Sequence, residues 1–190
     1  MGNREDLLAG AKQAILERGL AKVTARDIAG AAGVSLAAIG YHFGSKERLI
    51  AEAIAEATGD EIGQGMEAAI RDAGEGRSLP ESVAATWNGM LDVIQNHPDE
   101  LILSFENGVR VARSPESQQY FSEATEEVYT ALLEPLRAVH PELSAADARA
   151  VAKVYFALFQ GMALQWLIAP AAEPVTGDDV MRAVRAMAGK

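Results

Sequence analysis

The sequence of 190 residues predicts an all-α protein of about nine helices. Two observations lead to this fold class. Apolar side chains recur three and four residues apart in successive segments, which is the spacing of amphipathic helices. Glycines, prolines and capping residues separate these segments, and the sequence shows no internal repeat and no strand-like alternation of apolar and polar residues. The pattern divides the chain into a short N-terminal domain, 1–46, and a larger helical domain, 47–190.

The composition limits the kinds of protein that this chain can be. It has no cysteine, which excludes a disulfide framework and thiolate metal sites and is typical of a reducing compartment. The first residues are charged and lack the apolar core of a secretion signal. The longest apolar run, 154–169, contains two glutamines and is shorter than the ~20 residues that span a bilayer. We therefore expect a soluble, cytoplasmic protein with no membrane partner.

Charge is unevenly distributed along the chain. The net charge is −10, but residues 1–50 contain seven basic and five acidic side chains, a net of +2, which leaves −12 for the remainder. A mildly basic N-terminal segment is compatible with a phosphate-rich partner, while the acidic remainder favours solubility. Because the basic excess is small, it supports other observations and does not stand alone.

Residues 1–50 have the pattern of three short helices followed directly by the start of a fourth. The first helix is expected over 4–18. Each later helix begins with a hydroxyl side chain suited to N-capping, and glycines lie in the turns. Two short helices joined by a tight glycine turn are typical of the helix-turn-helix unit, whose second helix enters the major groove of DNA. The residues that define the pattern are the caps Thr24, Ser35 and Ser45, the glycines Gly19, Gly33 and Gly44, and the apolar Ile28, Ile39 and Phe43.

The residues around this turn are similar to those of a known family. Segments 33–35 (Gly-Val-Ser) and 41–49 (Tyr-His-Phe-Gly-Ser-Lys-Glu-Arg-Leu) resemble, in sequence and spacing, the DNA-binding domain of the TetR family of bacterial transcriptional regulators. The chain departs from the family at Gly40, where an aromatic residue is frequent, and at Ala37 and Ala38, where Gly or a polar residue is frequent. The resemblance implies a regulator that binds double-stranded DNA.

Ten residues are predicted to contact DNA, each with the alternative of a cap or a solvated surface side chain. Lys46 lies in the first turn of the fourth helix, where exposed backbone N–H groups favour anions, and the resemblance places a phosphate contact there. Tyr41 and His42 end the recognition helix with a hydroxyl and a ring N–H. The predicted set is Thr24, Arg26, Ser35, Leu36, Ala37, Ala38, Gly40, Tyr41, His42 and Lys46.

The outward face of the recognition helix is predicted to lack hydrogen-bonding side chains. Its positions are Leu36, Ala37, Ala38 and Gly40, whereas bidentate contacts to guanine and adenine use Arg, Lys, Asn or Gln. We therefore expect sequence preference to come from thymine methyl groups, close backbone approach at Gly40 and DNA shape.

The fourth helix begins at Lys46, and its apolar spacing continues to Ile70. Gly59, Gly63 and Gly65 lie within it, and each costs about 1 kcal/mol relative to Ala in a helix interior. Two interpretations remain open. The stretch is either a gap between two helices or a continuous but weakened helix that lets the N-terminal domain swing.

Further helices are expected over 80–97, 98–113, 116–139 and 144–168, and from 176 onward. The helix 144–168 is apolar on nearly every side, so we expect a second subunit to cover one of its faces. Two helix-turn-helix units related by a two-fold axis would bind a palindrome with half-sites about 34–36 Å apart or a multiple of it. The predicted dimer interface consists of Tyr155, Ala157, Leu158, Gly161, Gln165 and Ile168.

The resemblance implies that the C-terminal helices bind a small-molecule effector that weakens the grip on DNA. Apolar and amphipathic side chains in these helices are candidates for the pocket lining, with the alternative that they form the core. They are Trp87, Met90, Phe105, Tyr120, Phe121, Tyr129 and Phe159. The sequence does not define the effector.

An enzyme is not predicted. The three histidines, at positions 42, 97 and 140, are scattered, and the chain has no H-E-x-x-H, G-x-S-x-G or phosphate-binding glycine motif. No catalytic residue, cofactor or metal site is expected. The sequence favours a homodimeric repressor that binds a palindromic operator and is released by a small molecule. The alternative is a helical dimer that binds a ligand or partner protein and has weak or lost DNA binding.

Overall fold

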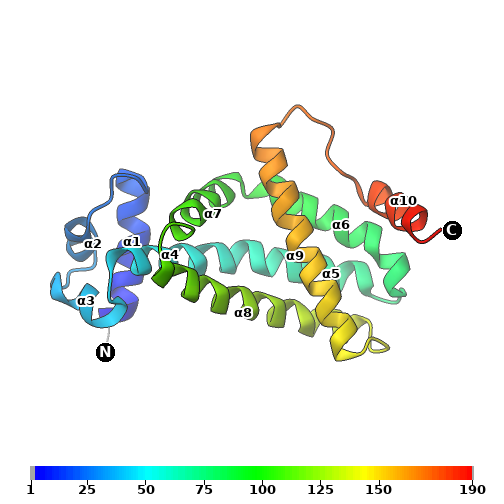
Figure 1. The fold of residues 1–190 in the computed structure, drawn as a ribbon, viewed down its shortest axis with the longest axis horizontal. Helices are drawn as coiled ribbons and strands as arrows, with labels where there is room; N and C mark the ends of the chain where they lie inside the picture. The colour runs from blue at the N-terminus through cyan, green and yellow to red at the C-terminus, as the bar shows by residue number, and fades with distance from the viewer. Residues whose placement is uncertain (1–2, 190) are drawn as a thin grey trace. The chain divides into compact units, whose positions relative to one another are not determined.

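The computed structural model describes residues 3–189, without the side chains of residues 3, 58, 60 and 116. Every regular element in this range is a helix (Figure 1). Because α4, the π-helical turn η1 and α5 follow one another without a break, the described helices number nine and confirm the prediction. The elements are α1 (Asn3–Arg18), α2 (Ala25–Ala31), α3 (Ala37–Phe43), α4 (Lys46–Thr58), η1 (Gly59–Gly63), α5 (Gln64–Gly74), α6 (Leu79–Asn96), α7 (Pro98–Val111), α8 (Pro115–Val139), α9 (Ala145–Ile168) and α10 (Gly177–Met187).

The chain forms two compact units whose borders differ from those of the expected domains. Unit 1 extends to Asp60 and also contains Ile102–Ala124, and unit 2 contains Glu61–Leu101 and the chain from Thr125 onward. The helix-turn-helix segment therefore folds together with α4 and with parts of α7 and α8. About fifty residues bury too little apolar surface to be stable alone, so these later helices supply the missing cover.

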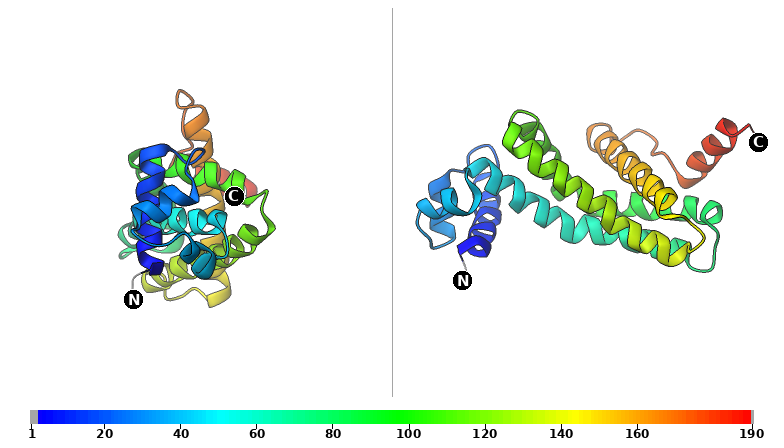
Figure 2. Two further views of the ribbon diagram at one scale, coloured as in Figure 1. Left: turned by 90° about the vertical axis from the view of Figure 1, so that its left-hand side faces the viewer. Right: turned by 60° about the horizontal axis from the view of Figure 1, so that its bottom comes forward.

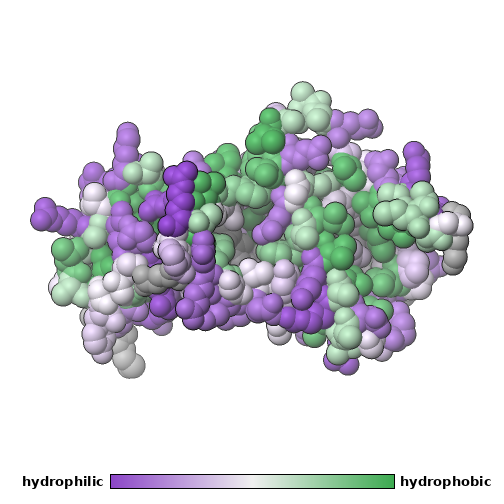
Figure 3. All heavy atoms as spheres, viewed as in Figure 1, coloured by the Kyte–Doolittle hydropathy of each residue, from purple (hydrophilic) through white to green (hydrophobic). Residues whose placement is uncertain are grey.

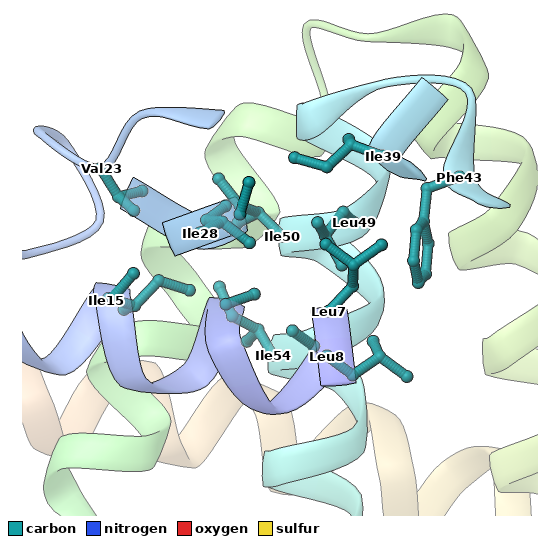
Figure 4. Packing of buried hydrophobic residues seen from close by; sticks show 14 of the residues in the cluster. Leu7, Leu8, Ile15, Val23, Ile28, Ile39, Phe43, Leu49, Ile50 and Ile54 are labelled. Atoms are coloured by element: carbon teal, nitrogen blue, oxygen red, sulfur yellow. The ribbon is translucent and has the colours of Figure 1, made fainter. Parts of the chain in front are cut away.

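The core of unit 1 lies where α1, α2, α3 and α4 meet (Figure 4). Leu7, Ile28, Phe43 and Leu49 are almost completely buried there. Burial of a side chain of this size contributes roughly 1.5–3 kcal/mol, so this cluster fixes the short helices against one another. Leu103 of α7 packs against the same cluster.

Two glycines give the short helices their sharp ends. Gly33 follows α2 with φ +65°, and Gly44 caps α3 with φ +75°. A side chain on an L-residue is strained in this left-handed region, which glycine enters without cost. The recognition helix is therefore bounded by turns that few other residues would form.

The connector from Lys46 to Gly74 is one continuous helix, which excludes a gap between two helices at its glycines. It passes through the π-helical turn η1, where a Cβ added to Gly59 or Gly63 would meet no atom within 4 Å. Gly65 differs, because a Cβ there would lie 2.7 Å from Val93 Cγ2 of α6. Gly65 thus permits close packing of α5 on α6, whereas the other two glycines only weaken the helix.

In unit 2, α5 and α6 lie side by side, and α9 and α10 also contact α6 (Figures 1 and 2). Trp87 and Met90 of α6 are buried in this unit. The Trp87 Nε1–H donates a 2.8 Å hydrogen bond to the carbonyl oxygen of Val175, just before α10. The indole therefore ties the C-terminal segment to α6.

One face of α9 is buried and the opposite face is exposed. The buried residues recur with helical spacing and include Ala152, Tyr155 and Phe159. Val154, Leu158 and Ile168 lie among the exposed large apolar side chains, and hydrophobic residues are visible along this helix (Figure 3). By length and composition, α9 is the one described helix that could cross a membrane, but a core helix of a soluble protein meets the same criterion.

Candidate DNA-binding interface

The start of α2 is fixed by a capping box between Thr24, which was predicted to cap this helix, and Asp27. The Asp27 N–H donates to Thr24 Oγ1 at 3.2 Å, and the Thr24 N–H donates to Asp27 Oδ2 at 3.0 Å. The Thr24 hydroxyl also donates to Asp27 Oδ2, at 2.7 Å. These bonds lower the pKa of the Asp27 carboxyl below its ordinary value of 3.8, and Arg18, 3.0 Å away, acts in the same direction. The main role of Thr24 is therefore to cap α2, and a phosphate would compete with Asp27 for the Thr24 hydroxyl.

The recognition helix α3 begins later than predicted. Ser35 was expected to cap it, but the helix starts at Ala37 with Leu36 at the N-cap position and no side-chain cap. The Ser35 carbonyl instead accepts a 3.0 Å bond from the Ala38 N–H, which forms a tight turn before the helix. Ser35 is exposed.

The outward face of α3 is largely as predicted, with one correction. Leu36, Ala37 and Gly40 are exposed, and Tyr41 is 85% exposed. Ala38, however, is buried, because it belongs to the same core cluster as Ile39 and Phe43. The exposed face therefore combines small or apolar residues with one phenol.

His42 is half-buried at the end of α3. Its ring lies edge-on to Tyr41, with 4.9 Å between centroids, and next to Phe43. The ring is held by its aromatic neighbours at the border between the core and the exposed face.

The start of α4 brings a lysine ammonium beside the start of α2. Ser45 caps α4 by accepting a 3.1 Å hydrogen bond from the Arg48 N–H. Lys46 Nζ donates to the carbonyl oxygen of Val23 at 3.4 Å and lies 3.5 Å from Glu47 Oε1. The Lys46 side chain is half-buried, and these two contacts hold its ammonium group at the surface. Arg26, in the first turn of α2, is exposed.

Comparison with known proteins identifies the family to which this chain belongs. The profile of "Bacterial regulatory proteins, tetR family" matches residues 7–53, and that of "BetI-type transcriptional repressor, C-terminal" matches residues 80–189. This chain belongs to the TetR family. It is a DNA-binding transcriptional regulator and not an enzyme. None of the curated proteins matches it by sequence.

Solved structures share the fold of this TetR-family regulator. The multidrug-binding protein EbrR in complex with imidazole is 18% identical with a TM-score of 0.65, over 95% of this chain and 91% of that chain. EbrR in complex with proflavin is 18% identical with a TM-score of 0.64, over 95% and 96% of the two chains. A transcriptional regulator from Rhodococcus sp. Rha1 is 22% identical with a TM-score of 0.53, over 98% and 94%.

The residues predicted to line an effector pocket are distributed over both units of the regulator. Trp87, Met90 and Phe159 are buried in unit 2, and Tyr129 is half-buried there with its ring 5.8 Å from that of Phe156. The other three, Phe105, Tyr120 and Phe121, belong to unit 1 and are half-buried. None of the seven lines the hollow of about 950 Å³ between α6 and α10, which is lined by residues such as Pro80, Ala84 and Met181.

Five of the six predicted dimer residues lie on the exposed face of α9. They are Ala157, Leu158, Gly161, Gln165 and Ile168. Tyr155 is the exception, because it lies on the buried face and is 6% exposed. Burial raises the pKa of its phenol, and its hydroxyl lies beside Thr86 without a hydrogen bond of normal geometry.

Two histidine clusters lie outside the set of residues predicted to contact DNA. His97 Nδ1 lies 3.1 Å from Glu61 Oε2 and 4.0 Å from Glu100 Oε2, on the surface, where such groups commonly pair without a metal. His140 Nε2 lies 3.2 Å from Ser82 Oγ, and the Ser82 hydroxyl donates to the Leu79 carbonyl. His140, which directly follows α8, and Ser82 of α6 are both buried, so this pair joins the end of α8 to α6.

Sequence reasoning missed a charged cluster in unit 1. Glu52 of α4 is buried between Arg4 of α1 and Arg48 of α4. The i,i+4 spacing of Arg48 and Glu52 was the available signal, but it is typical of solvated helix faces.

Proposed function

We propose that this TetR-family regulator is a cytoplasmic homodimeric repressor that binds a palindromic operator and is released by a small-molecule effector. The DNA-binding role belongs to residues 1–46, and effector binding and dimerisation belong to 47–190. The position of the Lys46 ammonium carries the proposal. Lys46 lies in the first turn of α4, and its ammonium donates a hydrogen bond to the carbonyl oxygen of Val23, just before α2.

Phosphate contacts anchor the protein on DNA in this account. Lys46 supplies a positive charge next to the N-terminal turn of α4, where backbone N–H groups add to the attraction for an anion. Arg26 is exposed and free to reach a neighbouring phosphate, and the Tyr41 hydroxyl extends from the end of α3. Such contacts set the register of the protein on the duplex and carry no sequence information of their own.

Sequence preference comes from the side chains and backbone of α3. Leu36 and Ala37 offer apolar contacts to thymine methyl groups, and Gly40 allows the helix backbone to approach the base edges. Because this face lacks the Arg, Lys, Asn and Gln side chains that bind guanine or adenine bidentately, DNA shape and deformability contribute the remainder.

The exposed face of α9 joins two subunits. Val154, Leu158 and Ile168 are large apolar residues that water contacts in the single chain. The small residues Ala157 and Gly161 between them let a partner helix approach closely. A second copy of α9 across a two-fold axis would bury this stripe and place two α3 helices for two half-sites.

An effector acts through the helices of the C-terminal part. EbrR, which shares the fold, holds proflavin or imidazole. The aromatic residues Trp87, Tyr129 and Phe159 are the unit 2 members of the proposed lining, and Met90 completes them. If the effector weakens DNA binding by some factor, operator DNA must weaken effector binding by the same factor.

Selection from a random double-stranded DNA library tests the proposal. The purified protein should enrich a palindrome with two A·T-containing half-sites, and a gel shift with that sequence should show one complex of a protein dimer. Lys46→Gln should lose affinity, whereas Lys153→Gln, which changes a lysine of unit 2, should retain it. Failure to enrich any sequence at low salt would instead support a helical dimer that binds a ligand or partner and has lost DNA binding.

A further inference from the structure

We propose that Glu52 is a positioning residue that couples the orientation of the recognition helix to α8. The proposal deepens the DNA-binding function above and rests on it. It starts from a chain of contacts inside unit 1 that runs from Tyr120 in α8 to Phe43 at the end of α3, through Arg48, Glu52 and Arg4.

The links of this chain are two ion pairs and two guanidinium–ring pairs. Arg4 Nη2 lies 2.5 Å from Glu52 Oε2, and Arg48 Nε lies 2.9 Å from Glu52 Oε1, so the two carboxylate oxygens bind different arginines. The Arg4 guanidinium carbon lies 5.2 Å from the centroid of the Phe43 ring. The Arg48 guanidinium carbon lies 6.0 Å from the centroid of the Tyr120 ring. Both distances are within the range of cation–π attraction.

The burial of Glu52 makes the arrangement sensitive to small displacements. Its side chain is 5% exposed, within a stretch of α4 where residues 49–54 are all buried. A carboxylate in such a place is tolerated only while its oxygens keep charged or hydrogen-bonding partners. If one arginine moves, the carboxylate must follow it or lose a partner, so a shift of Tyr120 is transmitted to the other arginine.

The far end of the chain touches the element that binds DNA. Phe43 is the last residue of α3, it is 1% exposed, and its neighbour His42 packs against both Phe43 and Tyr41. A change in the Arg4–Phe43 contact therefore alters the pose of the exposed Tyr41 and of the helix that carries it. The near end, Tyr120, belongs to a helix that continues into unit 2 and there carries Tyr129.

Proton NMR of the three histidines tests the coupling without DNA. His42 is the histidine of unit 1, and His42→Gln assigns its signal. Tyr120→Leu, at the opposite end of the contact chain, should displace the His42 signal by more than the linewidth, and Tyr120→Phe, which keeps the ring, should displace it less. The control is Thr130→Leu, which changes an exposed α8 residue whose hydroxyl bonds only the Glu126 carbonyl of the same helix, and it should leave the His42 signal in place. An unmoved His42 signal in Tyr120→Leu, or an equal displacement in Thr130→Leu, would overturn the proposal.

Operator affinity supplies the second readout. Glu52→Gln keeps the size of the side chain and breaks its bond to one arginine. Glu52→Gln and Tyr120→Leu should each weaken binding of the selected operator by about threefold or more, and the double variant should lose no more than the larger single loss. Multiplied losses, or a lower melting temperature with unchanged affinity, would mean that the cluster only stabilises the fold. If Glu52→Gln does not fold, the Tyr120 variants still decide the matter, and if no operator is found, the NMR result stands by itself.

Discussion

At the scale of single residues, Gly40 occupies a helical position where the fold has no need of a glycine. It lies inside α3, it is exposed, and a Cβ added to it would meet nothing within 4 Å. Gly30 in α2 shares all three properties. Since alanine favours a helix over glycine by about 1 kcal/mol, folding does not require a glycine at either position.

Gly40→Ala separates the folding role from the DNA-binding role. Both Gly40→Ala and Gly30→Ala should raise the free energy of unfolding by about 0.5–1 kcal/mol, measured by urea denaturation, because the unfolded chain loses conformational freedom. Gly40→Ala should also weaken operator binding by about tenfold or more, or at least 1.4 kcal/mol, since the methyl group occupies the space of a base edge. Unchanged affinity in Gly40→Ala would exclude close backbone approach at this position.

The carboxylates of three capping boxes make stability depend on pH. Hydrogen bonds from Thr24, Ser78 and Thr176 lower the pKa values of their partners, which are Asp27, Glu81 and Asp179. A lowered pKa means that the folded state binds fewer protons than the unfolded state. The stability from these caps is therefore complete above the ordinary pKa values, 3.8 for Asp and 4.5 for Glu, and is lost as the pH falls through the lowered ones.

Thermal denaturation between pH 7 and pH 3 checks this dependence. The melting temperature should be steady near neutral pH and should fall below about pH 4.5. Asp27→Asn should lower the melting temperature at pH 7 and make its decline in acid shallower, because one of the titrating caps is gone. The control is Asp99→Asn, an exposed acid in the first turn of α7, which should leave the acid slope nearly unchanged. An Asp27→Asn profile parallel to wild type would contradict this account.

At the scale of elements, local sequence signals predicted which segments are helical more accurately than the residue at which each helix starts. Ser45 and Ser35 have the same hydroxyl before a helix, yet only Ser45 forms a side-chain cap. The difference arises because Ser35 follows the tight turn at Gly33 and is used in another turn through its carbonyl. Likewise Gly65 and Gly63 are alike in sequence, and only the packing of α5 on Val93 distinguishes them. Such contacts with distant residues have no signature in a single sequence.

The π-helical turn η1 is expected to be the weakest part of the long connector. Its hydrogen bonds close a wider ring than those of an α-helix, and a Cβ added at Gly59 or Gly63 would meet no atom within 4 Å. Gly59→Ala combined with Gly63→Ala should stabilise this turn by roughly 1 kcal/mol per site. Amide hydrogen exchange should therefore be faster in η1 than in α4 in the wild type and slower in the double variant. Equal exchange in the two proteins would show that the glycines do not set the local stability.

At the scale of the whole molecule, the packing of the helices into larger units was the hardest property to predict from the sequence. The all-apolar pattern of α9 predicted burial on every side, but periodicity alone could not say which face the rest of the chain covers. The structure assigns Tyr155 to the covered face and Leu158 to the exposed one. The borders of the compact units were equally difficult to predict, because Ile102–Ala124 joins the helix-turn-helix only through contacts between residues distant in sequence.

Dimerisation through α9 has a matched test. Leu158→Glu places a charge in the proposed apolar interface and should convert the dimer to a monomer in analytical ultracentrifugation, because a buried unpaired charge costs several kcal/mol. Leu16→Glu changes another leucine, which is 85% exposed on α1, and should remain a dimer. A Leu158→Glu protein that is still dimeric would move the interface away from this face.

The salt dependence of operator affinity tests the central claim most directly. Each phosphate neutralised by a protein cation contributes about 0.9 to the slope of log K against log salt concentration on B-DNA. If each subunit of a dimer holds one phosphate with Lys46, Lys46→Gln should reduce the slope by about 1.8, and Lys153→Gln should leave it unchanged. A slope that Lys46→Gln does not alter, in a protein shown to be folded, would contradict the account.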